Sequence, residues 1–433
     1  MKLKKLIGIL AVAGLAAPGI ASATNGYFSH GYGMKAKGMG GAATATASDT
    51  MGGANNPASM AFVGNRFDVG VDWFSPIRSA KRVGSLGPDF TEDSGSNGFL
   101  VPEFGYNRMM GNNMSLGITV YGNGGMNTDY SSGSSVAANR CGAGAPASNP
   151  LCGPGKLGVN LEQLIVAPTF AYQVNASNSI GVSPLYVYQR FSANGLQAFG
   201  GLSSDSTKLT NTGHDSSTGW GVRLGWQGKV ADSVTLGAAY SPKINMSKFK
   251  RYAGLFAEGG DFDIPMNWSL GAAFKAMPAV TVALDFAHID YAGVKSINNS
   301  GITPGYTGPN SPLALGNGSG LGFGWSSVDV VKLGVEYKYN DAMTLRAGIN
   351  HGTNPVKSDQ TTFNILAPGV VTDHYTVGMT YSVSKDSEVT VAYMHAQEKS
   401  VSGTTNMYFN GVGGTETIKM YQNSLGAAYG MKF

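Results

Sequence analysis

The stretch TGWGVRLGWQGK (218–229) alternates large apolar side chains with small or polar ones. One set of positions carries Trp220, Val222, Leu224 and Trp226, and the other carries glycine, Arg223 and Gln227. Successive side chains of a β-strand point to opposite faces, so this strand would have one apolar and one small or polar face. That pattern is typical of a transmembrane β-barrel, whose strands turn apolar side chains to lipid and polar ones to the lumen.

The same alternation recurs at residues 234–240, 280–286, 333–339, 375–381, 389–393 and 425–433. Short polar turns join strands in pairs at residues 111–113, 175–178, 231–232, 276–278, 340–341 and 385–386. Long polar loops separate the pairs at residues 80–97, 123–158, 193–217, 247–264, 292–326, 355–372 and 401–417. This order predicts an all-β fold, an antiparallel barrel of about 14 strands over residues 64–433. A soluble all-β protein would instead carry charged residues on its exposed faces.

The composition agrees with an exported membrane protein. Of 433 residues, 13% are charged, against about 25% in soluble domains. Residues 1–23 have the three parts of a secretory signal peptide: basic Lys2, Lys4 and Lys5, an apolar run, and a small-residue end. Its removal lowers the formal charge from +4 to +1, and no basic stripe remains that would suit nucleic acid. No later stretch has the roughly 18 consecutive apolar residues of a transmembrane helix.

Residues 24–63 match neither helix nor strand periodicity and are rich in glycine, alanine and methionine. Such a segment cannot bury a core of its own, because small side chains contribute too little apolar area against the cost of ordering. We expect it to be a hatch, a plug held inside the barrel. The alternative interpretation of its Gly-rich turns is a phosphate-binding loop. The segment has neither the preceding strand nor the Lys-Ser/Thr ending of that motif.

Catalytic and metal-binding motifs are missing from the sequence. It has no G-x-S-x-G or H-E-x-x-H motif, and its six histidines show no ligand spacing. We therefore expect no enzyme activity, no metal and no cofactor. Cys141 and Cys152 are the only cysteines, and in an oxidising compartment they are expected to form a disulfide within their loop.

Gly122-Asn123-Gly124-Gly125 follows the strand-like residues 114–121. Glycine inside a strand marks a bulge, a bend or a close approach of another backbone. The residues alone leave two readings open, a bend within the strand or simply the end of the strand.

Short motifs are spread over the whole mature chain. The N-terminal ones are NGYF (25–28), HGYG (30–33), KGMGGA (37–42) and NPA (56–58). The later ones are SLG (115–117), TDY (128–130), LRAG (345–348), NPV (354–356), FNILAPG (363–369) and the terminal Phe433. Together these motifs resemble the long-chain fatty acid outer-membrane transporters of the FadL/TodX type. Tyr291 departs from the tryptophan expected there, and the loop with the two cysteines is specific to this chain.

The resemblance implies a 14-stranded barrel in which substrate is caught outside, bound within, and released sideways through a gap in the wall. The gap would lie at a kink of the third strand, Gly122 to Gly125, close to the hatch motif Asn56-Pro57-Ala58. Leu255 and Phe256 would contact ligand in an outer groove. Arg190 corresponds to an arginine beside the internal pocket, and Arg346 should face the lumen by alternation. Each arginine either binds a fatty acid carboxylate or pairs with acidic groups that hold the plug.

The sequence therefore predicts a monomeric channel in the outer membrane of a Gram-negative bacterium, in contact with outer-membrane lipid. Its partners would be hydrophobic small molecules, with long-chain fatty acids preferred. Uptake of aromatic hydrocarbons such as toluene by the same route is the first alternative. A structural or adhesive barrel with an immobile plug is the second.

Overall fold

The computed structural model describes residues 24–84, 89–131, 149–301, 306–405 and 414–433. The predicted signal peptide (1–23) and Cys141 lie outside these residues. The strands are β1 (Arg66–Val83), β2 (Phe90–Asp93), β3 (Phe99–Met109), β4 (Met114–Asn127), β5 (Gly158–Gln173), β6 (Asn178–Asn194), β7 (Asp215–Ala231), β8 (Val234–Ser241), β9 (Asn267–Met277), β10 (Val280–Ile289), β11 (Val328–Lys338), β12 (Met343–Gly352), β13 (Asp373–Ser382), β14 (Ser387–Thr404) and β15 (Thr415–Lys432).

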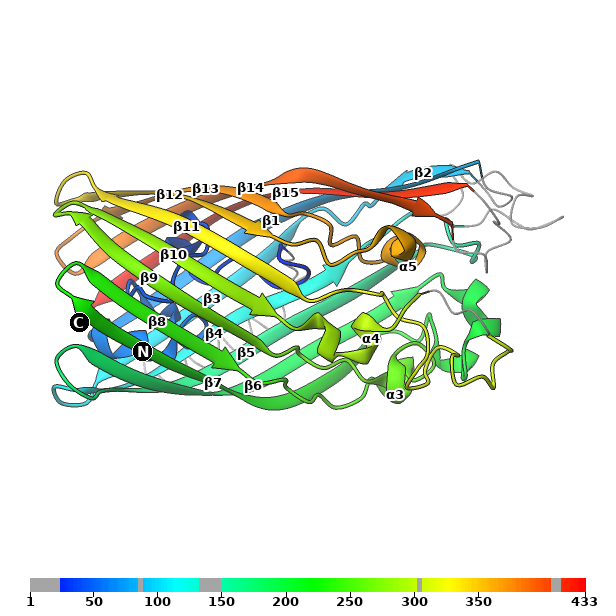
Figure 1. Cartoon of the computed structure of the whole chain (residues 1–433), viewed down its shortest axis with the longest axis horizontal. Coiled ribbons are helices and arrows are strands. Elements are labelled where there is room, and N and C mark those ends of the chain that lie inside the picture. The colour runs from blue at the N-terminus through cyan, green and yellow to red at the C-terminus, as the bar shows by residue number, and fades with distance from the viewer. Residues whose placement is uncertain (1–23, 85–88, 132–148, 302–305, 406–413) are drawn as a thin grey trace.

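Fourteen of these strands form a closed antiparallel barrel, as predicted (Figure 1). Neighbours in sequence pair with one another, and β15 returns to pair with β1 from Arg66↔Lys432 to Val83↔Thr415. The fifteenth strand, β2, pairs only with the outer end of β1. Closure satisfies the backbone groups that an open edge would leave unpaired in lipid.

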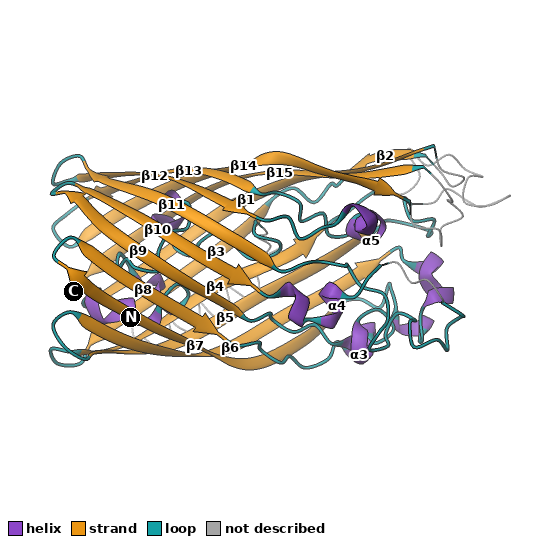
Figure 2. Cartoon of the chain, viewed as in Figure 1, coloured by secondary structure: helices purple, strands orange, loops and turns teal. Residues whose placement is uncertain are grey.

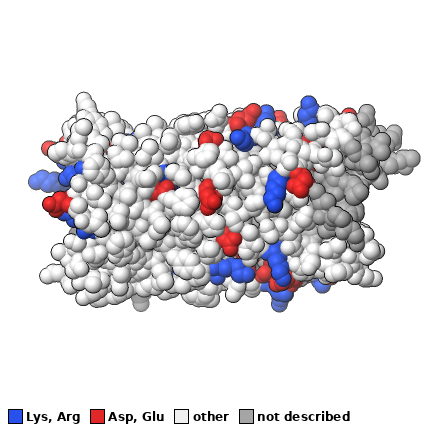
Figure 3. Space-filling model, in the orientation of Figure 1, with Lys and Arg blue, Asp and Glu red and all other residues white. Residues whose placement is uncertain are grey.

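The alternation that predicted the strands also gives the faces correctly. Exposed positions include Trp220, Leu284, Val377 and Leu425, whereas residues of opposite parity, such as Asp285, are buried. Large parts of the outer surface over the strands carry no charged side chain in Figure 3. No helix among the described residues is long and apolar enough to cross a bilayer.

The two ends of the barrel differ, as Figure 2 shows. The six short turns lie where they were predicted, at one end. At the other end, several strands run further than expected. β1 reaches Val83, β4 reaches Asn127 and β14 reaches Thr404, so the loops predicted to begin at 80, 123 and 401 begin later. The helices of this end are η3 (Gln197–Leu202), η4 (Ser206–Lys208), η5 (Lys250–Tyr252), α3 (Ala257–Gly260), η6 (Tyr291–Gly293), α4 (Lys295–Asn298), η7 (Ser358–Gln360) and α5 (Thr361–Asn364).

The hatch segment fills the lumen and is almost wholly buried. It contains three short helices that its sequence pattern did not predict, namely α2 (Met34–Gly38), η1 (Thr50–Gly53) and η2 (Pro57–Phe62). Its glycines allow close approach to the wall. Gly40 has a φ of +66°, and a Cβ there would lie 2.5 Å from the carbonyl oxygen of Ile349.

Carboxylates of the barrel wall hold the hatch. Lys37 Nζ lies 2.5 Å from Asp72 Oδ2, and both side chains are almost fully buried. Asp285 Oδ2 accepts hydrogen bonds from the backbone nitrogens of Ala43 (2.8 Å) and Thr44 (2.9 Å). Asp68 Oδ2 accepts one from the nitrogen of Thr50 at 3.0 Å. Charge-assisted bonds of this kind are strong, so the middle of the hatch is firmly attached.

Candidate functional site: an internal cavity and an open edge of the wall

A cavity lies inside the barrel between the hatch and the strands. The space in it that can hold the centre of a water molecule is about 70 Å³. Its apolar and aromatic lining includes Phe28 and Tyr32 of the hatch and Tyr121, Ile165 and Leu185 of the wall. Asn55, Asn267 and Asp285 line it as well, so the cavity combines apolar walls with polar groups, as small-molecule sites do.

Two basic side chains, Arg223 in β7 and Lys332 in β11, also line this cavity. Arg223 donates to the Asn55 carbonyl (3.1 Å from Nε, 3.0 Å from Nη2) and to Asn267 Oδ1 (2.8 Å). Lys332 Nζ donates to the carbonyl of His30 at 3.0 Å. Within the described part of the chain, neither cation has a carboxylate within 4 Å. Both cations therefore donate hydrogen bonds to neutral oxygens, and the carboxylate of Asp285, which also lines the cavity, is the opposite charge nearest to Lys332.

The barrel wall has an open edge between β3 and β4. These strands pair only from Glu103↔Tyr121 to Met109↔Ser115. Above Glu103, β3 continues to pair with β1, and β4 continues to pair with β5 from Gly122 to Asn127. The β4–β5 register shifts between Gly122 and Gly124, which marks a β-bulge at Asn123. Of the two readings left open by the sequence, the bend within a strand is therefore the right one.

The first residues of the hatch occupy this open edge. Phe28 forms an antiparallel bridge with Gly124. Gly125 N donates to Tyr27 O (3.1 Å), and Ser29 N donates to Asn123 O (3.2 Å). The segment Tyr27–Ser29 thus pairs with the edge of β4 that β3 leaves unpaired.

The NPA motif lies elsewhere, so the expectation that it sits beside the kink is wrong. The Asn56 side chain donates to Thr44 O (2.7 Å) and to Trp226 O (2.9 Å). Glycines of the β6–β7 wall leave room for the motif, because a Cβ on Gly225 would lie 2.1 Å from Asn56 Oδ1. The motif therefore fixes the far side of the hatch against β6 and β7.

A second, smaller cavity lies on the other side of Tyr27. It is lined by Gly26, Tyr27 and Gly125, and by Phe74 and Pro76 of β1. The first cavity is lined by Asn25, Phe28 and Ser29 of the same turn. The turn Asn25–Ser29 therefore separates the two cavities.

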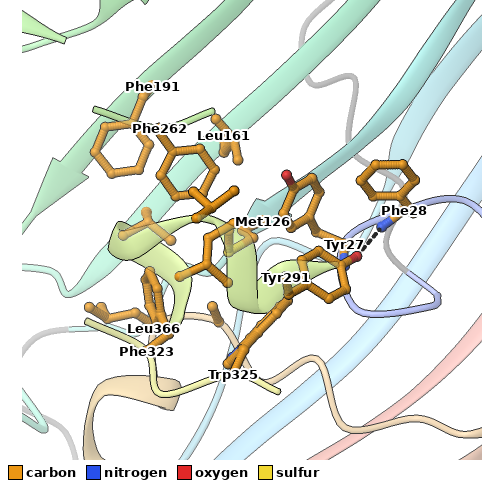
Figure 4. Packing of buried hydrophobic residues seen from close by; sticks show 14 of the residues in the cluster. Tyr27, Phe28, Met126, Leu161, Phe191, Phe262, Tyr291, Phe323, Trp325 and Leu366 are labelled. Carbon is orange, nitrogen blue, oxygen red and sulfur yellow. Dashed lines mark hydrogen bonds between the residues drawn. The ribbon is translucent and has the colours of Figure 1, made fainter. Parts of the chain in front are cut away.

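Tyr291 holds this turn in place. Its hydroxyl donates to Asn25 O at 2.6 Å and accepts from the nitrogens of Tyr27 (3.0 Å) and Phe28 (3.2 Å). Figure 4 shows its ring between Tyr27 and Trp325, within the aromatic cluster that covers the lumen. Burial raises the pKa of the Tyr291 hydroxyl well above its usual value, so the group stays neutral.

The two arginines singled out from the sequence do not line either cavity. Arg190 was expected to follow its strand, but β6 extends to Asn194 and alternation places Arg190 on the face opposite the buried Gln189. It pairs there with Glu162 at 2.8 Å, so its expected place beside the internal pocket is wrong. Arg346 does face the lumen, as predicted, and pairs with Glu336 at 2.7 Å.

Leu255 and Phe256 are buried in the outer aromatic cluster, where the Phe256 ring lies 4.7 Å from that of Phe191. Their contact with ligand stays a prediction. Cys152 is disulfide-bonded, and its pairing with Cys141 also stays a prediction because Cys141 lies outside the described residues. In the described ranges, no three His, Cys, Asp or Glu side chains cluster as a metal site.

The sequence pattern missed the roles of Arg223, Lys332 and Tyr291. Alternation had placed Arg223 on the lumen face, which was the one available signal. The alternation of Leu333, Val335 and Tyr337 likewise places Lys332 on the lumen face, but nothing in the local sequence shows that it borders a cavity.

Comparisons with known proteins agree with the fold. A model of the family "Outer membrane protein transport protein (OMPP1/FadL/TodX)" matches residues 14–433. The crystal structure of the Pseudomonas putida toluene transporter TodX is similar, with a TM-score of 0.66 and 20% identity over 93% of this chain and 99% of that one.

A Pseudomonas aeruginosa FadL homologue has a TM-score of 0.67 at 14% identity, covering 94% of this chain and all of the other, 100%. The Ralstonia pickettii toluene transporter TbuX has a TM-score of 0.63 at 18% identity, covering 93% and 99%. No curated protein sequence matched this chain.

A closed 14-stranded barrel with an internal hatch and a family match over nearly the whole chain lead to one conclusion. The chain belongs to the OMPP1/FadL/TodX family of outer-membrane transport proteins, which carry hydrophobic substrates.

Proposed function

We propose that this protein is a passive channel for long-chain fatty acids. The observation that carries this proposal is the pair Arg223 and Lys332, two cations that line one internal cavity and whose hydrogen bonds go to neutral oxygens. A carboxylate placed between them would gain charge-assisted hydrogen bonds, while the acyl chain would bury apolar surface. An aromatic hydrocarbon has no use for either cation.

The exit route that fits this cavity is sideways through the open edge between β3 and β4. A greasy molecule gains more by partitioning into lipid than by entering water, which favours a lateral exit over a periplasmic one. The turn Asn25–Ser29 separates the internal cavity from the cavity beside the open edge. Its displacement would join the two cavities into one path.

The gate is confined to the start of the hatch. This turn is held by neutral hydrogen bonds to β4 and to Tyr291, whereas the following segment is held by buried carboxylates. Neutral hydrogen bonds contribute less than charge-assisted ones, so detaching the start of the hatch from the wall costs less free energy than detaching the rest. The channel needs no energy source, because the fatty acid moves down its own gradient.

Direct binding to the refolded mature chain tests this proposal. Oleate, oleyl alcohol and toluene are compared by titration calorimetry, with Arg223→Gln, Lys332→Gln and the outward-facing Arg190→Gln as control. We expect saturable oleate binding that weakens by about 10- to 100-fold in either cavity variant, from the loss of one charged hydrogen bond. Oleyl alcohol binding should change little in any variant.

The ligand comparison separates the rival functions. Saturable toluene binding without oleate binding would favour hydrocarbon uptake and contradict the carboxylate site. Absence of saturable binding for all three ligands would favour a structural or adhesive barrel. Equal losses for oleate and oleyl alcohol would show that the cations only hold the hatch.

A further inference from the structure

Three of the six histidines lie on the outer face of the barrel and share one arrangement. They are His288 in β10, His351 in β12 and His395 in β14. Each ring contacts the next strand through Nδ1, and the partners are Asp329 Oδ1 (2.6 Å), Asp373 Oδ1 (2.6 Å) and Asn423 Oδ1 (3.0 Å). These histidines are far apart in the sequence, and the shared cross-strand contact becomes visible only once the strands are paired.

All three histidines have the parity of the outward-facing side chains of their strands, and His288 also borders the first cavity. In β10, His288 has the parity of the exposed Leu284 and Phe286, whereas Asp285 and Ile289 of opposite parity are buried. In β12 and β14, His351 and His395 have the parity of exposed Ile349 and Tyr393.

The three histidines lie at one height. His288 is the eighth residue after Val280, His351 the eighth after Met343, and His395 the eighth after Ser387, the first residues of their strands. These first residues follow short turns at the same end of the barrel (Figure 1). Eight residues at about 3.3 Å each, tilted by about 40°, raise the histidines about 20 Å above the turns.

This height lies a few ångström inside the outer boundary of the apolar band. The apolar band of such a barrel is about 25 Å tall. Below His395, Val391 and Tyr393 are exposed and apolar or aromatic, and above it the exposed ion pair Lys419–Glu398 follows, at 3.3 Å. On β6, the eighth residue after Asn178 is Tyr186, whose ring lies 5.0 Å from that of Trp220. Aromatic residues are common at this boundary, and on β13 and β14 the exposed Tyr375 and Tyr393 lie beside His395.

The pairing prepares each ring for an outward contact. The aspartate or asparagine oxygen accepts from Nδ1, which fixes the orientation of the ring and leaves Nε2 on its other side. A protonated imidazole donates from both nitrogens, so it can bridge its partner oxygen and an external anion. Head-group phosphates of the outer leaflet are the anions that meet the barrel at this height.

We propose that His288, His351 and His395 form a binding surface for phosphorylated glycolipid in the outer leaflet, with Nε2–H donating to head-group phosphate. The surface lies on β10–β15, on strands other than the β3 and β4 that border the open edge. Bound lipid would therefore fix the depth of the barrel without covering the exit.

The groups across the strands from the three rings are Asp329 and Trp268 for His288, Asp373 and Val331 for His351, and Asn423 and Tyr375 for His395. Tyr393 and the ion pair Lys419–Glu398 lie near His395.

Native mass spectrometry of the full mature chain in detergent tests this surface. Bisphosphorylated lipid A is compared with the same lipid after removal of both phosphates, at pH 6 and pH 8.5. The variants are the triple His288→Gln/His351→Gln/His395→Gln and, as a matched control, His214→Gln in an extracellular loop. We expect about tenfold tighter binding of the phosphorylated lipid to wild type at pH 6, a preference lost in the triple variant and kept in the control.

The alternatives give different results. An unchanged preference in the triple variant, with retained oleate binding as proof of folding, would overturn the proposal. So would a preference that disappears with EDTA at both pH values, because the aspartates would then bind phosphate through a divalent cation. Inhibition by millimolar inorganic phosphate alone would indicate a site for free phosphate and equally contradict a lipid surface.

Discussion

The backbone nitrogen of Gly125 in β4 donates a hydrogen bond of 3.1 Å to the carbonyl oxygen of Tyr27 in the hatch. The bond forms on the edge of β4 that β3 no longer covers. The hatch thereby completes the barrel wall where β3 and β4 stop pairing, next to the glycine bulge of β4. Any movement of Tyr27 away from β4 exposes an open edge toward lipid.

Removal of the Tyr291 hydroxyl should loosen the hatch turn. Tyr291→Phe keeps the ring in the aromatic cluster but leaves Asn25 O and the nitrogens of Tyr27 and Phe28 without this partner. Each buried group left unsatisfied costs about 1–3 kcal/mol. Hydrogen exchange at Tyr27 and Phe28 should accelerate, and oleate uptake into cells should rise. Tyr252→Phe, which removes a hydroxyl bonded within the outer loops, is the control. Unchanged exchange at Tyr27 and Phe28 would contradict this role.

The barrel itself could be predicted from sequence because period-two alternation encodes which face meets lipid. The strands around Trp220, Val377 and Leu425 show this directly, since their apolar residues are the exposed ones. The short turns followed from Asn, Asp, Gly or Pro between the alternating segments. The number of strands follows from the number of these turns, and closure follows from the backbone groups that lipid cannot satisfy.

The site could not be predicted in the same way. The direction of the Arg190 side chain depends on how far β6 continues beyond Gln189. Because β6 extends to Asn194, Arg190 is an outward-facing strand residue and not the first residue of a loop. The place of Asn56 depends on contacts with Trp226, 170 residues away in the sequence. Glycine-rich hatch residues carry no periodicity, so only the shape of the surrounding wall decides where they lie.

The buried ion pair of Lys37 and Asp72 should be essential for holding the hatch inside the barrel. Lys37→Met leaves an uncompensated carboxylate in the lumen and should destabilise the protein by about 3–5 kcal/mol. Urea unfolding from lipid vesicles measures this loss, and ion conductance in planar bilayers should rise as the plug loosens. The exposed turn pair Lys338–Asp341 offers the matched control, since Lys338→Met should leave both readouts unchanged. Equal effects of the two substitutions would refute a special role for the buried pair.

The loop between β8 and β9 should be more stable in mild acid. Burial and the neighbouring Asp263 carboxylate raise the pKa of Asp261 to about 6. The folded loop favours the protonated Asp261 carboxyl, which avoids burying a charge. The loop is therefore most stable below the unfolded-state pKa of about 4, and this extra stability is lost as the pH rises through the folded-state pKa of about 6. Amide exchange in residues 242–266, corrected for intrinsic rates, should therefore be slower at pH 5 than at pH 7. Asp261→Asn should remove the difference, and a difference that persists in this variant would assign it to another group.

The most direct test of the lateral route is a disulfide between the hatch turn and β4. Phe28 and Gly124 are antiparallel partners, and the Cα separation of such partners, about 4.5–5.5 Å, lies within the range that a disulfide spans. Phe28→Cys and Gly124→Cys are combined in a chain whose two native cysteines are serine, with each single cysteine variant as control. Oleate uptake into cells is measured before and after reduction. The account predicts that uptake is lost in the oxidised double variant and restored by reductant, whereas reductant does not change uptake in either single variant. Full uptake through a barrel shown to be cross-linked would contradict exit at the β3–β4 edge.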